Sequence, residues 1–526
     1  EVEQLEEIPT TDELMQNPDV LEKSVADSDD PDLTVVSSGD FWTIYRNTVN
    51  NEYNLRMFGN VPSSRPTAWN SYLKSIKHIE IEEATLTGSF ASYFRGTDFP
   101  VLESVRIEQC NLSGVTSFEM AFYNSGIEKV IIRDNDYPKA PSLLTATQYM
   151  FSLCRNLSEL DLSGLDTSAV TNMYAMFQNC TSLEELDLSN FDTSSATNMY
   201  AMFSGCRSLE KLDVSNFDTS SVAHMQFMFE KCSILEELDL SNFDTSSVTN
   251  MSYMFQLCPA LKSLYLDNFT DAAIMTGMFA GTTSLTYLFV SHNLSTFNNL
   301  ENTSWYDEKN WVQFSNLSQL QTYHRQQSEP IGYRKGAFLS LTMDAMGGEF
   351  EDAEEQKVQN KISGEYWEEV IPVKEGHYFD GWYLDQNFTN KFDFSLPAAV
   401  STTIYAKWVE NYTVIIPASI SLNEASELKV QGINRGSKTL SVGLNYEETT
   451  ISESNKLTLS NTADTTVRCL APMSWDGSET NPEKAILTLA PGSEITEGDA
   501  VMEIKSPENI QAGKYTGNVV FSIKYE

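Results

Sequence analysis

A single stretch of sequence recurs nine times in this chain. Residues 236–251 read EELDLSNFDTSSVTNM, and close variants stand at 184–199 and 158–173. Most copies are 26 residues apart, and their opening apolar residues are Ile76, Leu102, Ile127, Leu157, Leu183, Leu209, Leu235, Leu261 and Leu285. Because one such unit cannot bury its own apolar side, a repeat of this period predicts a solenoid whose stacked coils share one core.

Each copy contains two different hydrophobic periods. The LDL segment at 186–188 alternates apolar and polar residues, which is typical of a short strand with its Asp facing away from the core. Met199, Met202, Phe203 and Cys206 instead recur at helical spacing on one face. The polar DTSS residues between these segments favour turns and helix caps. The pattern therefore predicts one short strand and one short helix in every coil.

The residues that carry this pattern, LDLSNFDTSSVTNM followed by MFxxC, resemble the BspA-like leucine-rich repeats of bacterial surface proteins. The resemblance covers residues 39–338, including an aromatic flank on each side, and the flank at 298–338 carries a short helical pattern. It implies a leucine-rich-repeat solenoid in a secreted or bacterial cell-surface protein that serves adhesion. Partners differ between members of that family, so the resemblance implies no particular ligand.

Two further types of sequence follow the repeats. Residues 339–410 contain MDAMGGEF, FDGWY and YAKW, which resemble the Listeria–Bacteroides repeat, a small β-grasp-like module of surface proteins. Met346 stands where that family usually has Asn in its first turn. Residues 411–526 hold short alternating strands between polar turns and predict an all-β sandwich. The expected fold class is thus an α+β multidomain chain.

Charge and composition restrict the function further. The first 38 residues hold twelve acids and one Lys, which is typical of a disordered leader. A net charge of −40 argues against nucleic acid as a partner, because phosphates would be repelled. No run of 18 apolar residues predicts a membrane span. The first residue is Glu1 rather than Met, which suggests an export signal that was removed or left out of the sequence.

Two repeated side chains resemble ligand sets at first sight. Stacked equivalents point the same way, so we expect buried reduced thiols rather than neighbouring disulfides or a zinc site at Cys154, Cys180, Cys206, Cys232 and Cys258. The Asp of each FDTS turn should accept hydrogen bonds from nearby backbone N–H groups, because calcium needs six or more oxygens. These residues are Asp166, Asp192, Asp218 and Asp244. Neither a metal nor a cofactor is expected.

The strand positions that face away from the core carry the candidate binding residues, since packing does not fix them. They are acidic in the middle coils and aromatic in the last ones: Glu185, Asp187, Asp213, Glu237, Asp239, Tyr265, Tyr287 and Phe289. Like charges one coil apart repel, so the acids are interpreted either as a binding face or as a solubilising face. Exposure of all three aromatic residues would favour binding, and their burial under residues 298–338 would favour a scaffold.

No catalytic fingerprint occurs in the sequence, and its five His residues are scattered, so we do not expect an enzyme. The leading hypothesis is a monomeric adhesin-like protein that binds an extracellular protein or glycan of a host or of neighbouring bacteria through the strand face. The alternative is a surface scaffold or cell-wall structural protein without a dedicated ligand.

Overall fold

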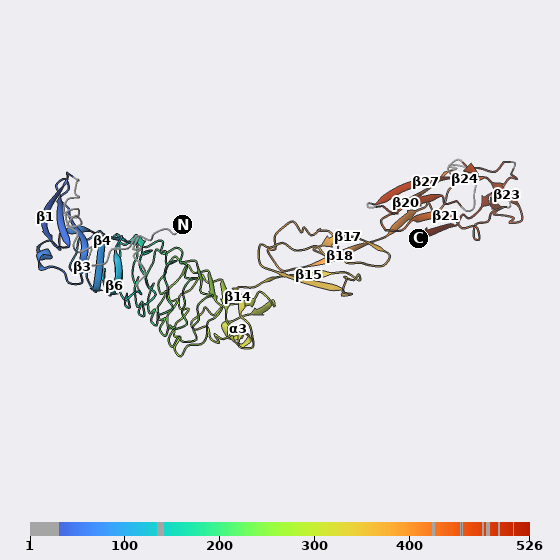
Figure 1. The fold of residues 1–526 in the computed structure, drawn as a ribbon. Helices are drawn as coiled ribbons and strands as arrows, with labels where there is room; N and C mark the ends of the chain where they lie inside the picture. The colour runs from blue at the N-terminus through green and yellow to red at the C-terminus, as the bar shows by residue number, and fades with distance from the viewer. Residues whose placement is uncertain are drawn as a thin grey trace, which may run out of the picture. The chain divides into compact units, whose positions relative to one another are not determined.

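The computed structural model describes residues 31–133, 141–422, 427–452, 454, 456–475, 478–479, 484–492, 495–508 and 510–526 (Figure 1). The chain divides into two compact units, Glu1–Ala337 and Phe338–Glu526. Residues 1–30 of the predicted disordered leader lie outside the described residues. The end of that leader was predicted wrongly, because Leu33–Gly39 form a strand that pairs with the next one.

The first unit begins with an eight-stranded sheet. Its strands are β1 (Leu33–Gly39), β2 (Trp42–Asn47), β3 (Tyr53–Pro62), β4 (Ile76–Ser89), β5 (Ser104–Glu108), β6 (Asn111–Ser117), β7 (Lys129–Arg133) and β8 (Glu159–Asp161). The 3-10 helix η1 (Thr67–Ser71) lies between β3 and β4 in the chain. Pairing is antiparallel from β1 to β3 and parallel from β3 onward, as stacking of repeats requires.

A second sheet of six strands closes this unit. It consists of β9 (Glu237–Asp239), β10 (Ser263–Leu266), β11 (Tyr287–Val290), β12 (Trp305–Asp307), β13 (Val312–Phe314) and β14 (Ile331–Lys335). The strands β9, β10 and β11 are parallel, and β14 pairs with β11 in the antiparallel sense. The short helix expected in this flank is α3 (Leu317–His324). A strand of opposite direction thus covers the last repeat edge.

The prediction of a helix in every coil, and with it the α+β fold class, is wrong. Within the described residues the helices are η1 and α3, and the Met–Met–Phe segments form successive tight turns. In the segment 173–180, the N–H of Met176 donates to the carbonyl of Met173, three residues back, at 3.2 Å. The N–H of Ala175 instead donates to Tyr200 of the next coil at 2.7 Å. A helix would keep these bonds within its own segment.

Left-handed backbone conformations make these turns possible. One repeat position, two residues before the stacked phenylalanine, has a positive φ in eight successive coils: 56° at Ser92, 53° at Met120, 56° at Tyr149, 51° at Ala175, 51° at Ala201, 58° at Phe227, 58° at Tyr253 and 64° at Gly277. Parallel bridges link the turn segments of neighbouring coils, from Ser117 and Ala146 to Asn250 and Ile274. The apolar side chains still recur at three- and four-residue spacing, which is why the sequence resembled a helix. The result is a β-solenoid.

One continuous core runs through the first unit. It extends from Trp42 to Tyr333, and all nine opening residues of the repeats are buried in it. Phenylalanine rings of consecutive coils stack with centroids 5.2 to 5.9 Å apart, at Phe94, Phe122, Phe151, Phe177, Phe203, Phe229, Phe255 and Phe279. Each coil therefore contributes to its neighbours' burial, as the repeat predicted.

The repeat cysteines are buried as expected, and the turn aspartates accept the backbone hydrogen bonds that the sequence predicted. The five repeat cysteines are buried and unpaired, and the Cys206 thiol donates to the Phe177 carbonyl at 3.1 Å. Oδ1 of Asp192 accepts a hydrogen bond from the N–H of Ser194 at 3.0 Å, and the other three turn aspartates do the same with the residue two positions on. In the part of the chain that the structure describes, no three His, Cys, Asp or Glu side chains are grouped to hold a metal ion.

The second unit begins with a mixed four-stranded sheet of β15 (Leu339–Asp344), β16 (Gln356–Lys361), β17 (His377–Tyr383) and β18 (Thr402–Glu410). The strand order is β16-β15-β18-β17, with the parallel pair β15 and β18 at the centre. Leu341, Met343, Trp382 and Ile404 belong to its core. Residues 338–410 are all described and contain no helix.

The rest of the second unit is antiparallel. Its strands are β19 (Tyr412–Ile415), β20 (Glu427–Asn434), β21 (Leu440–Leu444), β22 (Leu457–Asn461), β23 (Arg468–Ala471), β24 (Met473–Trp475), β25 (Ser478–Glu479), β26 (Leu487–Leu489), β27 (Thr496–Ile504), β28 (Tyr515–Thr516) and β29 (Phe521–Tyr525). They form one five-stranded and two three-stranded sheets, which share one apolar core.

Candidate binding face

The register of the parallel strands places outward residues of successive coils side by side. Two adjacent columns result near the end of the solenoid: Asp239, Tyr265, Phe289 and Gly332 in one, and Glu237, Ser263, Tyr287 and Arg334 in the other. Strand pairing at about 4.8 Å keeps neighbours in a column within reach of one ligand. The face that these outward positions form is called the strand face below.

All five predicted acids of the strand face are exposed. Asp213, Glu237 and Asp239 lie together and line a shallow groove of about 810 Å³ between two successive coils. Glu185 and Asp187 lie outside this groove lining. Within the described residues, the three groove acids form no ion pair, although Lys211 also lines the groove.

The Asp column also has a structural role that the sequence analysis did not recognise. Oδ1 of Asp187, Asp213 and Asp239 accepts a hydrogen bond from the N–H of the Ser two residues on, at 2.9, 3.0 and 2.9 Å. The bonds with the serine backbone and side chain lower the pKa of the Asp187 and Asp213 carboxyls, because they stabilise the charged form. These carboxylates thus shape the turn that follows each Asp while remaining exposed.

The strand ladder is interrupted where the outward column is entirely acidic. The first sheet ends with β8 at Asp161 and the second begins with β9, whereas residues 184–188 and 210–214 between them are not in strands. Parallel bridges on the turn side continue through the same coils, for example between Asn198 and His224. We attribute the interruption to repulsion between carboxylates one coil apart, roughly 1 kcal/mol per pair in water and more near a protein surface.

The three aromatic residues are half-buried, so neither the fully exposed nor the fully covered arrangement is realised. The Tyr287 hydroxyl donates to Glu308 at 2.8 Å, and the Arg334 guanidinium lies over the Tyr287 ring, 4.6 Å from its centroid. Burial, and then the bond to Glu308, raise the pKa of Tyr287. A Cβ at Gly332 would lie 2.7 Å from both Glu308 Oε1 and the Tyr287 hydroxyl, so a larger residue there would displace these side-chain ends.

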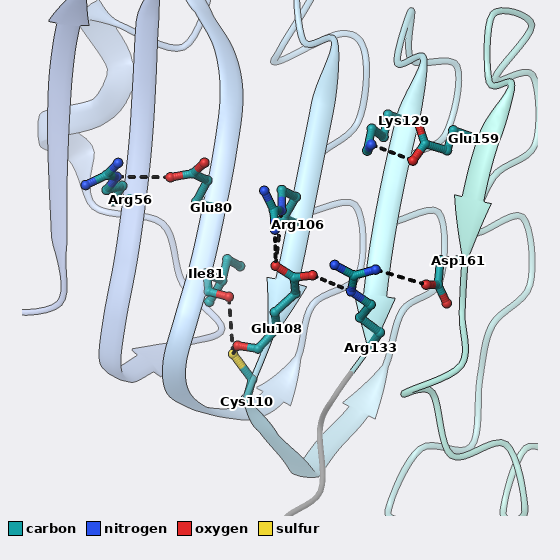
Figure 2. A network of polar contacts seen from close by, with 10 residues as sticks. All are labelled: Arg56, Glu80, Ile81, Arg106, Glu108, Cys110, Lys129, Arg133, Glu159 and Asp161. Carbon is teal, nitrogen blue, oxygen red and sulfur yellow. Dashed lines mark hydrogen bonds and ion pairs between the residues drawn. The ribbon is translucent and has the colours of Figure 1, made fainter. Parts of the chain in front are cut away.

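At its N-terminal end the strand face is charge-compensated, which the sequence analysis missed (Figure 2). Glu108 lies between Arg106 and Arg133, with Oε1 2.6 Å from Arg133 Nε. Arg133 also reaches Asp161 at 3.9 Å, and Lys129 pairs with Glu159. Burial raises the pKa of Glu108, but the hydrogen bonds from both arginines outweigh this effect and lower it. The column of alternating charges in the aligned repeats could have revealed this network.

A second line of aromatic side chains on the turn side was also missed. The half-buried rings are 4.5 to 6.2 Å apart and form one row: Tyr123, Tyr149, Tyr174, Tyr200, Phe227 and Tyr253. They come from different positions of the repeat, so a column-by-column alignment does not bring them together. The available signal was an aromatic residue beside most Met–Phe segments.

Family models match both parts of the chain. Residues 89–211, 145–269 and 184–293 match the family described as "Mycoplasma protein of unknown function, DUF285". Residues 340–407 match the Listeria–Bacteroides repeat domain, which confirms that resemblance. The matched repeat family is thus DUF285, and neither a leucine-rich repeat nor a C-terminal β-sandwich is among these matches.

Comparisons with whole proteins add little. No curated protein matches the chain. One similar solved structure comes from work titled "Chaperone-tip adhesin complex is vital for synergistic activation of CFA/I fimbriae biogenesis"; it is 12% identical, with 35% of this chain and 78% of that chain covered and a TM-score of 0.16. So low a TM-score bears on neither fold nor function. Among the described residues, no helix has the length and hydropathy needed to cross a membrane.

Proposed function

We propose that the chain is a bacterial secreted or cell-surface adhesin-like protein, without catalytic activity, that binds an extracellular protein or glycan as a monomer through the strand face. The observation that carries this proposal is the groove with Asp213, Glu237 and Asp239, which form no ion pair within the described chain, although Lys211 also lines the groove. Half-exposed Tyr265 lies beside it in register with Asp239. Groups that are unpaired and adjacent to aromatic surface are typical of recognition sites.

The resemblance of the repeats to those of bacterial surface proteins supports the extracellular location, as does the matched Listeria–Bacteroides repeat. The alternative remains a surface scaffold without a dedicated ligand. Its supporting observation is the bond from each column Asp to a Ser backbone N–H, because this bond accounts for the aspartates without any partner.

An array of glycans and extracellular proteins, probed with the full chain, separates the two functions. An adhesin-like protein should retain a small set of partners, and their binding should weaken as salt is raised, because exposed charges are screened over roughly 8 to 10 Å at physiological ionic strength. Retention of no partner at low salt would favour the scaffold.

A further inference from the structure

The chain binds its own arginines in one recurrent way at both ends of the solenoid. Arg56 lies over the Tyr45 ring at 5.3 Å and pairs with Glu80 of the neighbouring strand at 3.0 Å. Arg334 lies over Tyr287 at 4.6 Å and pairs with Glu308 at 2.5 Å. In each case a planar guanidinium contacts a tyrosine ring and a carboxylate together, which a rigid, flat cation does better than an ammonium group.

The same set of groups occurs at Tyr265, but without a cation. Asp239 is in register with Tyr265. Glu237, two residues earlier on β9, is in register with Ser263. Both acids, after desolvation, contribute to a raised pKa of Tyr265, which reflects their proximity to its hydroxyl. Within the described residues, no Lys or Arg lies over the Tyr265 ring, and neither acid forms an ion pair.

Two nearby cations of the chain are already engaged, whereas Lys211 lines the groove beside Glu237 and Asp239 without an ion pair within the described residues. Lys262 pairs with Glu236 at 2.6 Å, and Arg334 pairs with Glu308 over the Tyr287 ring. The Tyr287 ring contacts Tyr265 at a centroid distance of 5.6 Å and so limits access from the last coils. On its other side, half-exposed Tyr265 is in register with Asp239, which lines the groove together with Glu237.

From this arrangement we propose that Tyr265, Asp239 and Glu237 form a recognition site for an arginine side chain on the surface of a partner protein. The guanidinium lies over the Tyr265 ring and donates to the two carboxylates, as Arg334 does with Tyr287 and Glu308. This inference rests on the proposed function and deepens it, since it names a protein partner and the residue that is read.

The test titrates the full chain with the blocked peptide GSRSG, followed by saturation-transfer NMR of the peptide. Two further peptides carry lysine or citrulline in place of arginine; citrulline keeps the shape of arginine but not its charge. We expect the arginine peptide to bind most tightly and the citrulline peptide not to bind. Equal binding of the arginine and lysine peptides would overturn the proposal, because it would indicate attraction by net charge alone.

Substitutions test whether the arginine peptide binds at Tyr265 and Asp239. Tyr265→Leu should weaken binding of the arginine peptide roughly 2- to 30-fold, the range of one cation–π contact, and Tyr265→Phe should retain it. Asp239→Asn should weaken binding, whereas the identical change Asp187→Asn, two coils away, should not. Asn preserves the acceptor for the Ser N–H, so both variants keep the turn. Equal effects of the two Asn variants would contradict the site even if Tyr265→Leu failed to fold.

These experiments distinguish failure of the arginine site from failure of the proposed adhesin-like function. A partner retained on the array whose affinity is unaffected by Tyr265→Leu and by Asp239→Asn would leave the adhesin-like function standing and overturn the arginine site. Absence of binding by every array partner and by the arginine peptide would overturn both.

Discussion

Met346 has a backbone conformation that favours asparagine or glycine. Its φ is 49°, and its N–H donates to Oδ1 of Asp344 at 2.8 Å. The left-handed region costs a side chain such as Met about 1 kcal/mol, whereas Asn tolerates it. We expect Met346→Asn to raise the free energy of unfolding of the second unit by about 0.5 to 1 kcal/mol in urea denaturation. Gly347→Ala, at φ 78°, should change it in the opposite direction; a loss of stability in the Asn variant would contradict this reading.

The repeat cysteines should be chemically inert in the folded protein. Burial raises the pKa of Cys154 and of Cys206 to about 12, so the reactive thiolate is scarce at neutral pH. A thiol reagent should therefore leave the five repeat cysteines unmodified in the native protein and modify all of them after denaturation without reductant. Half-buried Cys469 should react first. Detection of a Cys180–Cys206 bridge by mass spectrometry would refute this prediction.

At the scale of elements, a glycine substitution in a turn segment should change stability in opposite directions for chained turns and for a helix. Ala201 has a φ of 51°, and Gly277 occupies the equivalent position in a later coil. Ala201→Gly should therefore keep or raise stability by up to about 1 kcal/mol, whereas in a helix it would cost about 1 kcal/mol. Urea denaturation of the full chain measures the difference. Ala196→Gly, at a buried residue without a positive φ, serves as the control and should destabilise.

The strand half of most coils could be predicted from the sequence, and the turn half could not. Leu238 and Leu240 alternate with Asp239, and a pleated backbone is the simplest way to bury both leucines, as β9 does; residues 184–188 and 210–214 have the same pattern but are not in strands. Three- and four-residue spacing, in contrast, is produced both by a helix and by chained turns with one left-handed residue. Alanine, tyrosine and phenylalanine at that position hid the left-handed conformation, although Gly277 was a visible sign of it.

The candidate site was predictable only in part, because some of its residues belong to the repeat and others do not. The outward columns follow from the repeat, so the positions of Asp239 and Tyr265 beside each other could be read from the aligned copies. Glu308 and Arg334 belong to the non-repetitive flank, and no period relates them to Tyr287. Half-burial of the aromatic residues therefore depended on contacts that only a three-dimensional structure reveals.

At the scale of the whole molecule, the shared core predicts that damage spreads between coils. Leu238 is 1% exposed, and Leu238→Ala should cost about 2 to 5 kcal/mol by leaving a cavity. Leu212, at 9% exposure, should give a smaller loss on the same change. Hydrogen exchange should show loss of protection in the neighbouring coils as well. A loss below about 1 kcal/mol for Leu238→Ala in equilibrium unfolding would contradict the stacked core.

The charge of the strand face makes a second prediction for the whole molecule. Replacing Asp187, Asp213 and Asp239 together by Asn keeps the acceptor oxygens of the turns and removes three negative charges. Association with a basic partner should slow, and folding should stay intact or improve as repulsion is relieved. Stopped-flow association at two salt concentrations measures the effect. A partner indifferent both to this variant and to salt would bind elsewhere on the chain.

The bonds between coils also bear on how the number of coils is inherited. The N–H of Ala175 donates to Tyr200, and the N–H of Ala201 donates to Gln226 in the next coil at 2.8 Å. Removing residues 183–208 would bring Ala175 opposite Gln226, an acceptor of the same kind at the same place. In-frame loss or gain of one repeat of DNA thus leaves every type of bond intact, and recombination between the near-identical copies becomes a route by which a lineage alters the extent of its binding face without redesigning any part of it.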